Sequence, residues 1–127
     1  MRNRLALEEI NEIKNNEWVI FSTSKNNIPH SIIVMPSRIE EDKIILSNIQ
    51  MNNSIANISN NPNCFIDVYL KNSNDKQIKI DCLAQVYNNG KLYDEIKEYE
   101  ERNNLPEDLK VRSIIVAEIK KVEVSEG

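Results

Sequence analysis

Glycine, cysteine and histidine are scarce in this sequence of 127 residues, which contains two glycines, two cysteines and one histidine. A single histidine cannot build a histidine-based metal cluster, so we assign no metal ligand and expect no catalytic zinc. Two cysteines are too few for a disulfide framework. With so little glycine, turns must depend on the 19 asparagines, because asparagine tolerates the left-handed backbone region better than most residues.

Long apolar runs and positive charge are also missing. No run approaches the roughly 18 residues of a membrane-spanning helix, and the stretch from Met1 to Glu9 lacks the apolar core of a signal peptide. The net charge of -4 and the aromatic content of 6% argue against an OB-like nucleic-acid barrel, which needs a basic surface and a stacking platform. We therefore expect a cytoplasmic protein with reduced thiols that binds neither nucleic acid nor membranes.

The hydrophobic content of 40% and the charged content of 28% are typical of a globular chain, and the length predicts one domain over residues 1–127. Apolar periodicity predicts three helices, at residues 6–16, 51–61 and 91–103. Runs rich in β-branched and aromatic residues predict six strands, at residues 18–24, 30–39, 43–48, 63–70, 77–87 and 112–124.

The order of these elements predicts a mainly β fold with flanking helices, in which six antiparallel strands form a small closed or partly open barrel. Short links between the first three strands favour an antiparallel meander. Within the second strand, the run from Ile32 to Met35 predicts burial on both faces, and Pro36 predicts a bulge or the end of ladder pairing.

Charged residues are absent from Ile44 to Ile66, although asparagine, serine and glutamine keep this stretch polar. One interpretation is an ordinary asparagine-rich loop and helix, and the other is a neutral, hydrogen-bonding ligand surface. Asn52 or Asn53 is expected to cap the helix that starts here. The free N–H groups at a strand-to-helix junction suit a phosphate, Ser54 adds a hydroxyl donor, and Asn57, one turn later, can reach back to the loop.

Other reactive residues receive structural interpretations. His30, beside Pro29 at a strand start, is expected to be structural or exposed, and the serines and threonine at residues 22–24 lack the histidine and glycine elbow of a hydrolase. Cys64 and Cys82 face each other if their hairpin is centred near Ser73. We expect buried thiols there, with a redox pair or a strained bridge as alternatives. We assign no catalytic residue.

Several of these segments occur in an order that resembles the pyridoxamine 5'-phosphate oxidase-like family of FMN-binding split barrels, and most closely its small bacterial FMN-binding proteins. The similarity covers about residues 5–124 and is carried by Trp18 to Thr23, Ile28 to His30, Ser47 to Ile58, and Asn61-Pro62 before a strand. The resemblance implies a six-stranded split β-barrel and a homodimer with FMN at the subunit interface. It further implies an oxidoreductase or electron carrier that meets a small-molecule redox substrate or electron donor.

The resemblance also implies three groups of cofactor-binding residues. One group runs beside the isoalloxazine ring, one supplies backbone contacts near the ring and phosphate, and one matches the Lys-Thr pair and the asparagine that hold the phosphate. In that order they are Val34, Met35 and Pro36; Asn48, Ile49 and Gln50; and Asn53, Ser54 and Asn57.

Asn53 stands where the family has lysine, so a bound phosphate lacks its main cation. Arg38, Arg112 or the second subunit are candidate replacements. The arginine-rich substrate motifs of true pyridoxamine phosphate oxidases are not evident, and we do not assign that activity. The alternatives are a split barrel that binds a deazaflavin, haem or another flat cofactor, and a cofactor-free dimer that acts as a binding or regulatory module.

Overall fold

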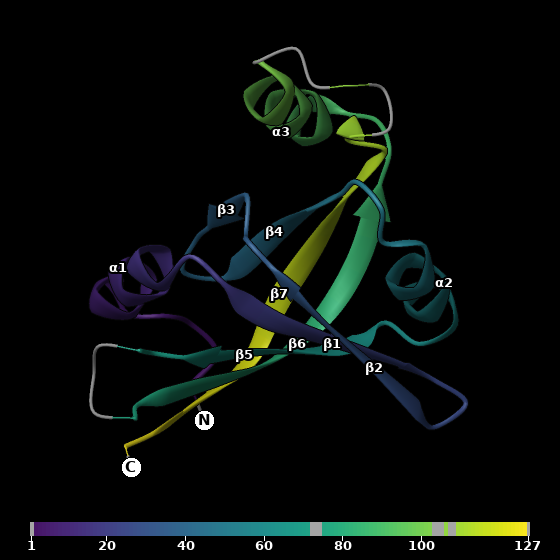
Figure 1. Ribbon diagram of the computed structural model, residues 1–127. Coiled ribbons are helices and arrows are strands. Elements are labelled where there is room, and N and C mark those ends of the chain that lie inside the picture. Colours follow the sequence, from purple (N-terminus) through teal and green to yellow (C-terminus); the bar gives the residue numbers. More distant parts are fainter. Residues whose placement is uncertain (1, 72–74, 103–105, 107–108, 127) are drawn as a thin grey trace.

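Three helices surround one antiparallel β-sheet in the computed structural model, which describes residues 2–71, 75–102, 106 and 109–126. Figure 1 shows their arrangement. The elements are α1 (Leu7–Asn16), β1 (Val19–Lys25), β2 (Ile28–Val34), β3 (Arg38–Ile39), β4 (Lys43–Asn48), α2 (Asn52–Asn60), β5 (Asn63–Tyr69), β6 (Gln77–Tyr87), α3 (Lys91–Glu101) and β7 (Ser113–Ser125). All three helices occur where the apolar periodicity predicts them, and the predicted end of the third at Asn103 lies outside the described residues.

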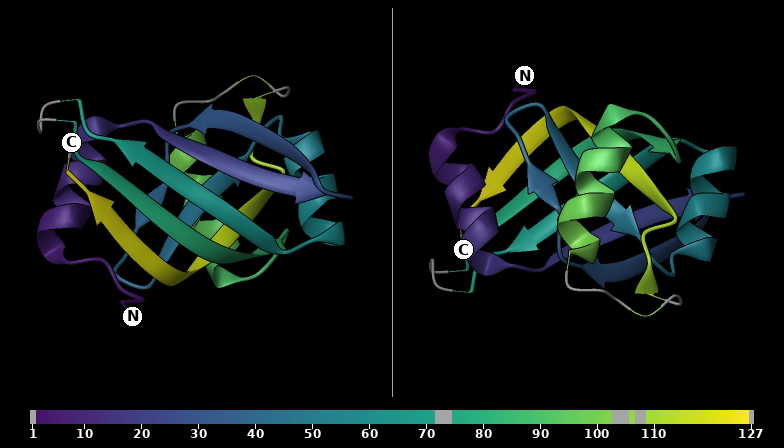
Figure 2. Two further views of the ribbon diagram at one scale, coloured as in Figure 1. Left: turned by 90° about the horizontal axis from the view of Figure 1, so that it is seen from below. Right: turned by 90° about the horizontal axis from the view of Figure 1, so that it is seen from above.

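The strand order across the sheet is β2-β1-β5-β6-β7-β4-β3, with every neighbouring pair antiparallel. Figure 2 shows how this sheet curls into a barrel, with α1 and α2 at opposite ends. The barrel is split, because no ladder in the described part of the chain joins the end strands β2 and β3 to each other. The prediction of a mainly β split barrel with flanking helices is confirmed.

The described residues form seven strands rather than the six predicted, because the expected strand over residues 30–39 divides at Pro36. Proline has no N–H to donate to a ladder, so pairing with β1 stops at Val34. Pairing starts again at Arg38, which lies opposite Ile45 of β4.

The predicted meander of the first three strands is right in its two pairings, β1 with β2 and β3 with β4, but the break at Pro36 separates them into two hairpins. β2 pairs with β1 at one end of the sheet, whereas β3 and β4 lie at the other end, where β4 pairs with β7. The prediction that β2 is buried on both faces is wrong. Ile33 is 68% exposed, while Ile32 and Val34 pack against the core. An edge strand of an antiparallel sheet has only one covered face, and side chains alternate between its two faces.

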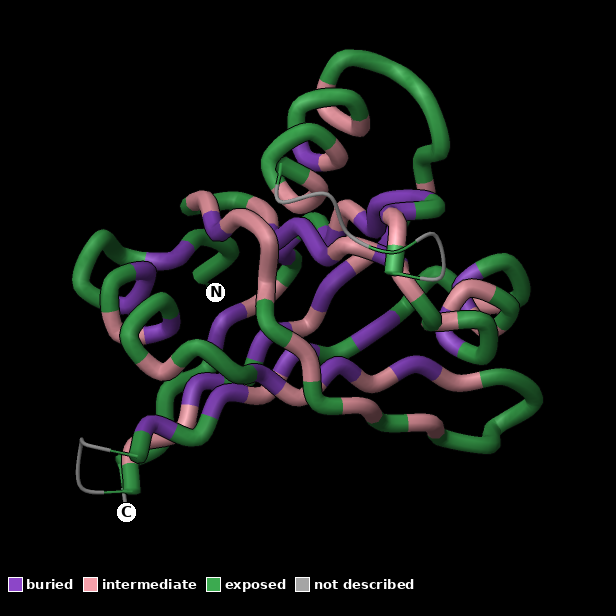
Figure 3. Tube along the Cα trace, turned by 45° about the horizontal axis from the view of Figure 1, so that its top comes forward, coloured by how far each residue is buried: buried purple, intermediate pink, exposed green. Residues whose placement is uncertain are grey.

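The interior of the barrel is a core of aliphatic side chains. Phe21, Ile66, Ile80 and Ile115 from four different strands are completely buried, and Figure 3 shows buried residues concentrated along the strands in the middle of the molecule. α1 packs against β5, α2 packs against β1 and β6, and α3 packs against β7. Burial of each such aliphatic or aromatic side chain stabilises the fold by about 1.5–3 kcal/mol.

Cys64 and Cys82 lie opposite each other in the β5–β6 ladder, as predicted, and both are buried free thiols. Ser73, the predicted centre of their hairpin, lies outside the described residues. None of the helices in the described ranges combines the length and the apolar character needed to cross a membrane.

Candidate functional site

Three adjoining hollows lie along β2 and the start of α2. The first, the apolar hollow, has a volume of about 450 Å³ and is lined mainly by β2 and the segments after β2 and β4. The middle hollow, of about 350 Å³, shares Ile32, Gln50 and Met51 with the first. The polar hollow, of about 380 Å³, shares His30 and Asn53 with the middle one. Together they form one continuous surface, the β2–α2 groove, and each is within the range of about 300–1,000 Å³ typical of ligand sites.

The period of two along β2 builds one wall of the groove. His30, Ile32 and Val34 alternate with Ser31 and Ile33, so the first three face α2 and the other two face outward. Hydrogen bonds hold α2 against β1: Asn57 Nδ2 donates to Thr23 Oγ1 at 3.0 Å, and Asn61 Nδ2 donates to Ser24 Oγ at 3.0 Å.

The chemistry of the groove changes along its length. The apolar hollow is lined by aliphatic and thioether side chains and by two hydroxyls, Ser37 and Ser47, which share a hydrogen bond of 2.6 Å. The other end is lined by asparagine, serine and histidine side chains and by Lys25, together with the apolar Ile28, Pro29 and Ala56. Glu100 of α3 lines the apolar hollow, so the Glu100 carboxylate and the Lys25 ammonium belong to opposite ends of the groove. This gradient suits a ligand with a flat apolar part and an anionic end.

The start of α2 has no side-chain cap and no acidic residue in its first turn. The predicted caps, Asn52 and Asn53, are wrong: the N-cap position is Met51, because Asn48 Oδ1 accepts the Met51 N–H at 2.8 Å and so moves the helix start. α1 is different, since its first turn carries the acidic residues Glu8 and Glu9. The first-turn N–H groups of α2 and the positive end of its dipole therefore remain available to an anion.

Ser54, in the first turn of α2, is only 1% exposed, and it lines the middle hollow. Its Oγ is the one buried side-chain oxygen or nitrogen within the described ranges that has no hydrogen-bond partner. An unsatisfied buried hydroxyl costs about 1–3 kcal/mol. Because Ser54 lines the middle hollow, a ligand oxygen there is a candidate partner for this hydroxyl.

Eight of the nine residues that the resemblance points to line the β2–α2 groove. They are Val34, Met35, Pro36, Ile49, Gln50, Asn53, Ser54 and Asn57. The ninth, Asn48, is buried and does not line it; its Nδ2 donates to Ser113 Oγ at 2.9 Å and its carbonyl accepts the Arg112 N–H at 2.9 Å. Asn48 therefore positions the loop before α2.

Sequence reasoning did not place Lys25, His30, Ile32 or Glu100 at the site. Side chains alternate along a strand, so His30 and Ile32 were predictable as residues on the same face as Val34. Glu100 had no such signal, because only the packing of α3 brings it to the apolar hollow. The two arginines considered as replacement cations do not line the groove, and Arg38 instead forms an ion pair of 3.6 Å with Glu95.

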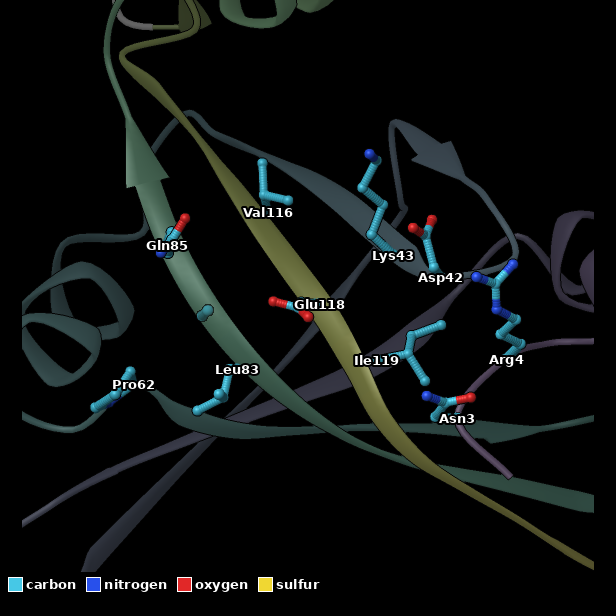
Figure 4. Close-up of a pocket in the computed structure, with 11 residues that line it drawn as sticks. Asn3, Arg4, Asp42, Lys43, Pro62, Leu83, Gln85, Val116, Glu118 and Ile119 are labelled. Atoms are coloured by element: carbon cyan, nitrogen blue, oxygen red, sulfur yellow. The ribbon is translucent and has the colours of Figure 1, made fainter. Parts of the chain in front are cut away.

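A separate hollow of about 520 Å³ lies on the outer face of β6, β7 and β4 (Figure 4). Its lining carries both signs of charge, including Arg4 and Glu118. Arg4 pairs with Glu41 at 2.7 Å and Glu118 pairs with Lys120 at 3.0 Å. No buried side-chain polar atom in the described part of this lining lacks a partner. The β2–α2 groove is therefore the better candidate site.

No family model and no curated protein matches the sequence, but solved structures do. A protein from Listeria innocua provisionally named a pyridoxamine 5'-phosphate oxidase has a TM-score of 0.78 at 8% identity, covering 94% of this chain and 97% of its own. An FMN-binding protein from Syntrophomonas wolfei has a TM-score of 0.71 at 20% identity, covering 93% and 84%. HutZ, named as the heme storage protein of Vibrio cholerae, has a TM-score of 0.67 at 12% identity, covering 97% and 94%.

These neighbours share the pyridoxamine 5'-phosphate oxidase-like FMN-binding fold, and the predicted resemblance is confirmed at that level. At identities of 8–20% the likeness establishes the fold. The names of the neighbours cover more than one ligand, so the choice of ligand depends on the residues of this chain's own groove.

Proposed function

We propose that the β2–α2 groove binds FMN and that the protein is an oxidoreductase or electron carrier. The observation that supports this best is the buried, unpaired hydroxyl of Ser54 at an uncapped helix start, in the middle hollow of the groove. FMN has the matching shape, with a flat apolar ring at one end and a phosphate at the other. When bound, the flavin supplies the redox chemistry, and the protein supplies position and hydrogen bonds.

Val34, Met35 and Pro36 are proposed to contact the ring, because they line the apolar hollow. The phosphate is proposed to accept hydrogen bonds from Ser54 Oγ and from the first-turn N–H groups around Asn53. Asn57 lines the polar hollow, but its Nδ2 is already bonded to Thr23. Its proposed role is therefore to hold α2 at the distance from β1 that the ligand requires.

A homodimer is proposed to complete the site. Large apolar side chains are exposed near the groove and on the outer face of the strands beside it, among them Ile33, Met35 and Phe65. Ile33 lies opposite Ile20 of β1, and Phe65 lies opposite Ser22, so this surface is continuous across β2, β1 and β5. A second copy would cover it and exclude water from the ring. Light scattering at micromolar concentration should give the mass of a dimer, and a monomer with and without FMN would contradict this.

The experiment that tests FMN binding compares two substitutions on α2. Asn52→Glu adds a carboxylate at the start of the helix, where it lines the middle hollow, and Asn60→Glu adds one at the far end. The carboxylate of Asn52→Glu interacts favourably with the helix dipole but repels a phosphate, so the affinity for FMN should fall without loss of protein stability. Asn60→Glu is the matched control for net charge and should leave affinity unchanged.

FMN is titrated into apo-protein while the flavin fluorescence is followed, and thermal unfolding of each variant is measured. Absence of binding by the wild type, or equal binding by the wild type and Asn52→Glu, would overturn the proposal.

Haem is a second candidate because His30, the only histidine in the chain, lines the groove and could ligate iron. The absorption spectrum of purified protein and a titration with hemin distinguish the two ligands. A haem Soret band that is lost in His30→Ala, without flavin binding, would support haem. Two alternatives remain: the groove binds a deazaflavin in place of FMN, or the protein binds no cofactor.

A further inference from the structure

The polar end of the groove lacks the cation expected on α2. Asn53 replaces the lysine of the resembling family, and no charged residue occurs from Ile44 to Ile66. Ser54 and the helix N–H groups can donate hydrogen bonds, but they carry no net charge to balance a phosphate dianion. A cation that balances this charge would have to come from another element that reaches the groove.

Lys25, the last residue of β1, lines the polar hollow together with Asn53 and Asn57. Its ladder partner is Ile28, and the two residues between them, Asn26 and Asn27, have φ values of 52° and 65°. Two consecutive positive φ values are the signature of a type I′ turn, which matches the twist of the strands that it joins. The tight hairpin therefore holds the backbone of Lys25 beside the start of α2.

The charge of Lys25 is not neutralised by the protein. No ion pair involves Lys25 within the described ranges, and the same holds for Lys14, whereas Lys76, Lys97, Lys110, Lys120 and Lys121 each pair with a glutamate. His30 joins Lys25 in lining the polar hollow and extends to the middle hollow, where Ser54 lies. No described carboxylate lines either hollow, so nothing on α2 or the β1–β2 hairpin competes there with a bound anion.

We propose that Lys25 and His30, on the β1–β2 hairpin, bind the ligand phosphate and select phosphorylated flavin over riboflavin. This inference rests on the proposed function. The two residues replace a cation on the helix with the Lys25 ammonium and a hydrogen-bonding imidazole on the opposite wall of the groove. The anion then lies between the hairpin and the first turn of α2, with Ser54 Oγ as an additional donor.

The test measures dissociation constants for FMN and for riboflavin, which lacks the phosphate. Lys25→Met and His30→Gln should each weaken FMN binding about fivefold and leave riboflavin binding unchanged, because each removes one charge-assisted contact to phosphate. Lys25→Arg should retain most of the affinity, since it keeps the charge. Lys14→Met, an exposed lysine in the last turn of α1, is the matched control and should bind both flavins like the wild type. Thermal unfolding confirms that each variant folds.

The outcomes separate this inference from the proposed function. If FMN binds and both variants match the wild type, Lys25 and His30 play no part and the inference is overturned, while FMN binding stands. If neither flavin binds, the proposed function fails, and inorganic phosphate replaces the flavin as the probe. Amide resonances of Asn53 and Ser54 should then shift on titration with phosphate in the wild type and shift less in Lys25→Met. No shift in the wild type would overturn the inference as well.

Discussion

Asn57 on α2 donates a hydrogen bond from Nδ2 to Oγ1 of Thr23 on β1, at a distance of 3.0 Å. Thr23 is buried and lies opposite His30 in the β1–β2 ladder. The bond therefore joins α2 to β1, and the ladder connects β1 to β2. Together they set how far α2 lies from the β1–β2 hairpin.

Removal of this bond should lower stability. Asn57→Ala and Thr23→Val should each cost about 1 kcal/mol, and in a double-mutant cycle the two changes should couple by a similar amount. Chemical denaturation of the two single variants and the double variant measures the coupling free energy. Strictly additive effects would show that the hydrogen bond contributes nothing to the packing of α2.

Ser54→Ala should separate stability from binding. The substitution deletes a buried hydroxyl without a partner and improves helix propensity, so the free energy of unfolding should stay constant or rise by up to about 1 kcal/mol. Affinity for FMN should instead fall about fivefold, because one hydrogen bond to a charged acceptor is lost. Urea denaturation and FMN titration give the two quantities. A loss of stability with unchanged affinity would mean that Ser54 serves the fold alone.

Asn53→Lys restores the cation of the resembling family and should tighten FMN binding about fivefold, or about 1 kcal/mol. Asn60→Lys, at the other end of the helix, controls for net charge and should have no such effect. Fluorescence titration of the apo-proteins compares them. If the wild type does not bind FMN and Asn53→Lys does, the natural chain has lost the flavin, and the non-enzymatic binding module becomes the better proposal.

Cys64 and Cys82 should be reduced and chemically inert. The neighbouring Cys64 thiol and burial raise the pKa of Cys82, which leaves little of the reactive thiolate at neutral pH. Labelling of native protein with a thiol reagent should be slow and should accelerate on unfolding. A folded variant with both cysteines changed to alanine should bind FMN like the wild type. Rapid labelling of the native state would instead support a redox role.

Glu101, at the end of α3, should make stability depend on pH. Its Oε2 accepts hydrogen bonds from Lys97 Nζ and from the Val111 N–H, both at 2.6 Å, and the Lys97 ammonium lowers the pKa of this carboxyl below its ordinary value of 4.5. A lowered folded-state pKa stabilises the protein above the unfolded-state value, and this stabilisation is lost as the pH falls through the folded-state value.

Glu101→Gln should therefore unfold at a lower temperature than the wild type at pH 7, and the difference should shrink as the pH falls below 4.5. Thermal unfolding from pH 7 to pH 3 checks this prediction. The exposed pair Lys120–Glu118 is a control, since Glu118→Gln should change the unfolding temperature little at any pH. A constant difference between Glu101→Gln and the wild type would contradict the assignment.

Local pattern in the sequence was sufficient for the helices, for most of the strands and for the opposition of Cys64 and Cys82. These features depend on neighbours in the chain: apolar periodicity marks a helix or strand, and hairpin register follows from the position of the turn. The turn at Asn26 and Asn27 was predictable for the same reason, because asparagine accepts the left-handed backbone that the turn requires. The spacing of motifs was also enough to suggest the fold family.

Only the tertiary structure decided which strands close the sheet and what lines the polar end of the groove. The chain leaves the β1–β2 hairpin at Pro36. β4 then pairs with β7, more than 60 residues later, and no local signal in the sequence specifies that partner. Lys25 and Ser54 are ordinary residues in the sequence. They become a candidate anion site because packing of α2 on β1 buries one hydroxyl without a partner, and Lys25 lines the hollow that adjoins the one lined by Ser54. Such a property belongs to the surroundings of a side chain, and long-range packing creates those surroundings.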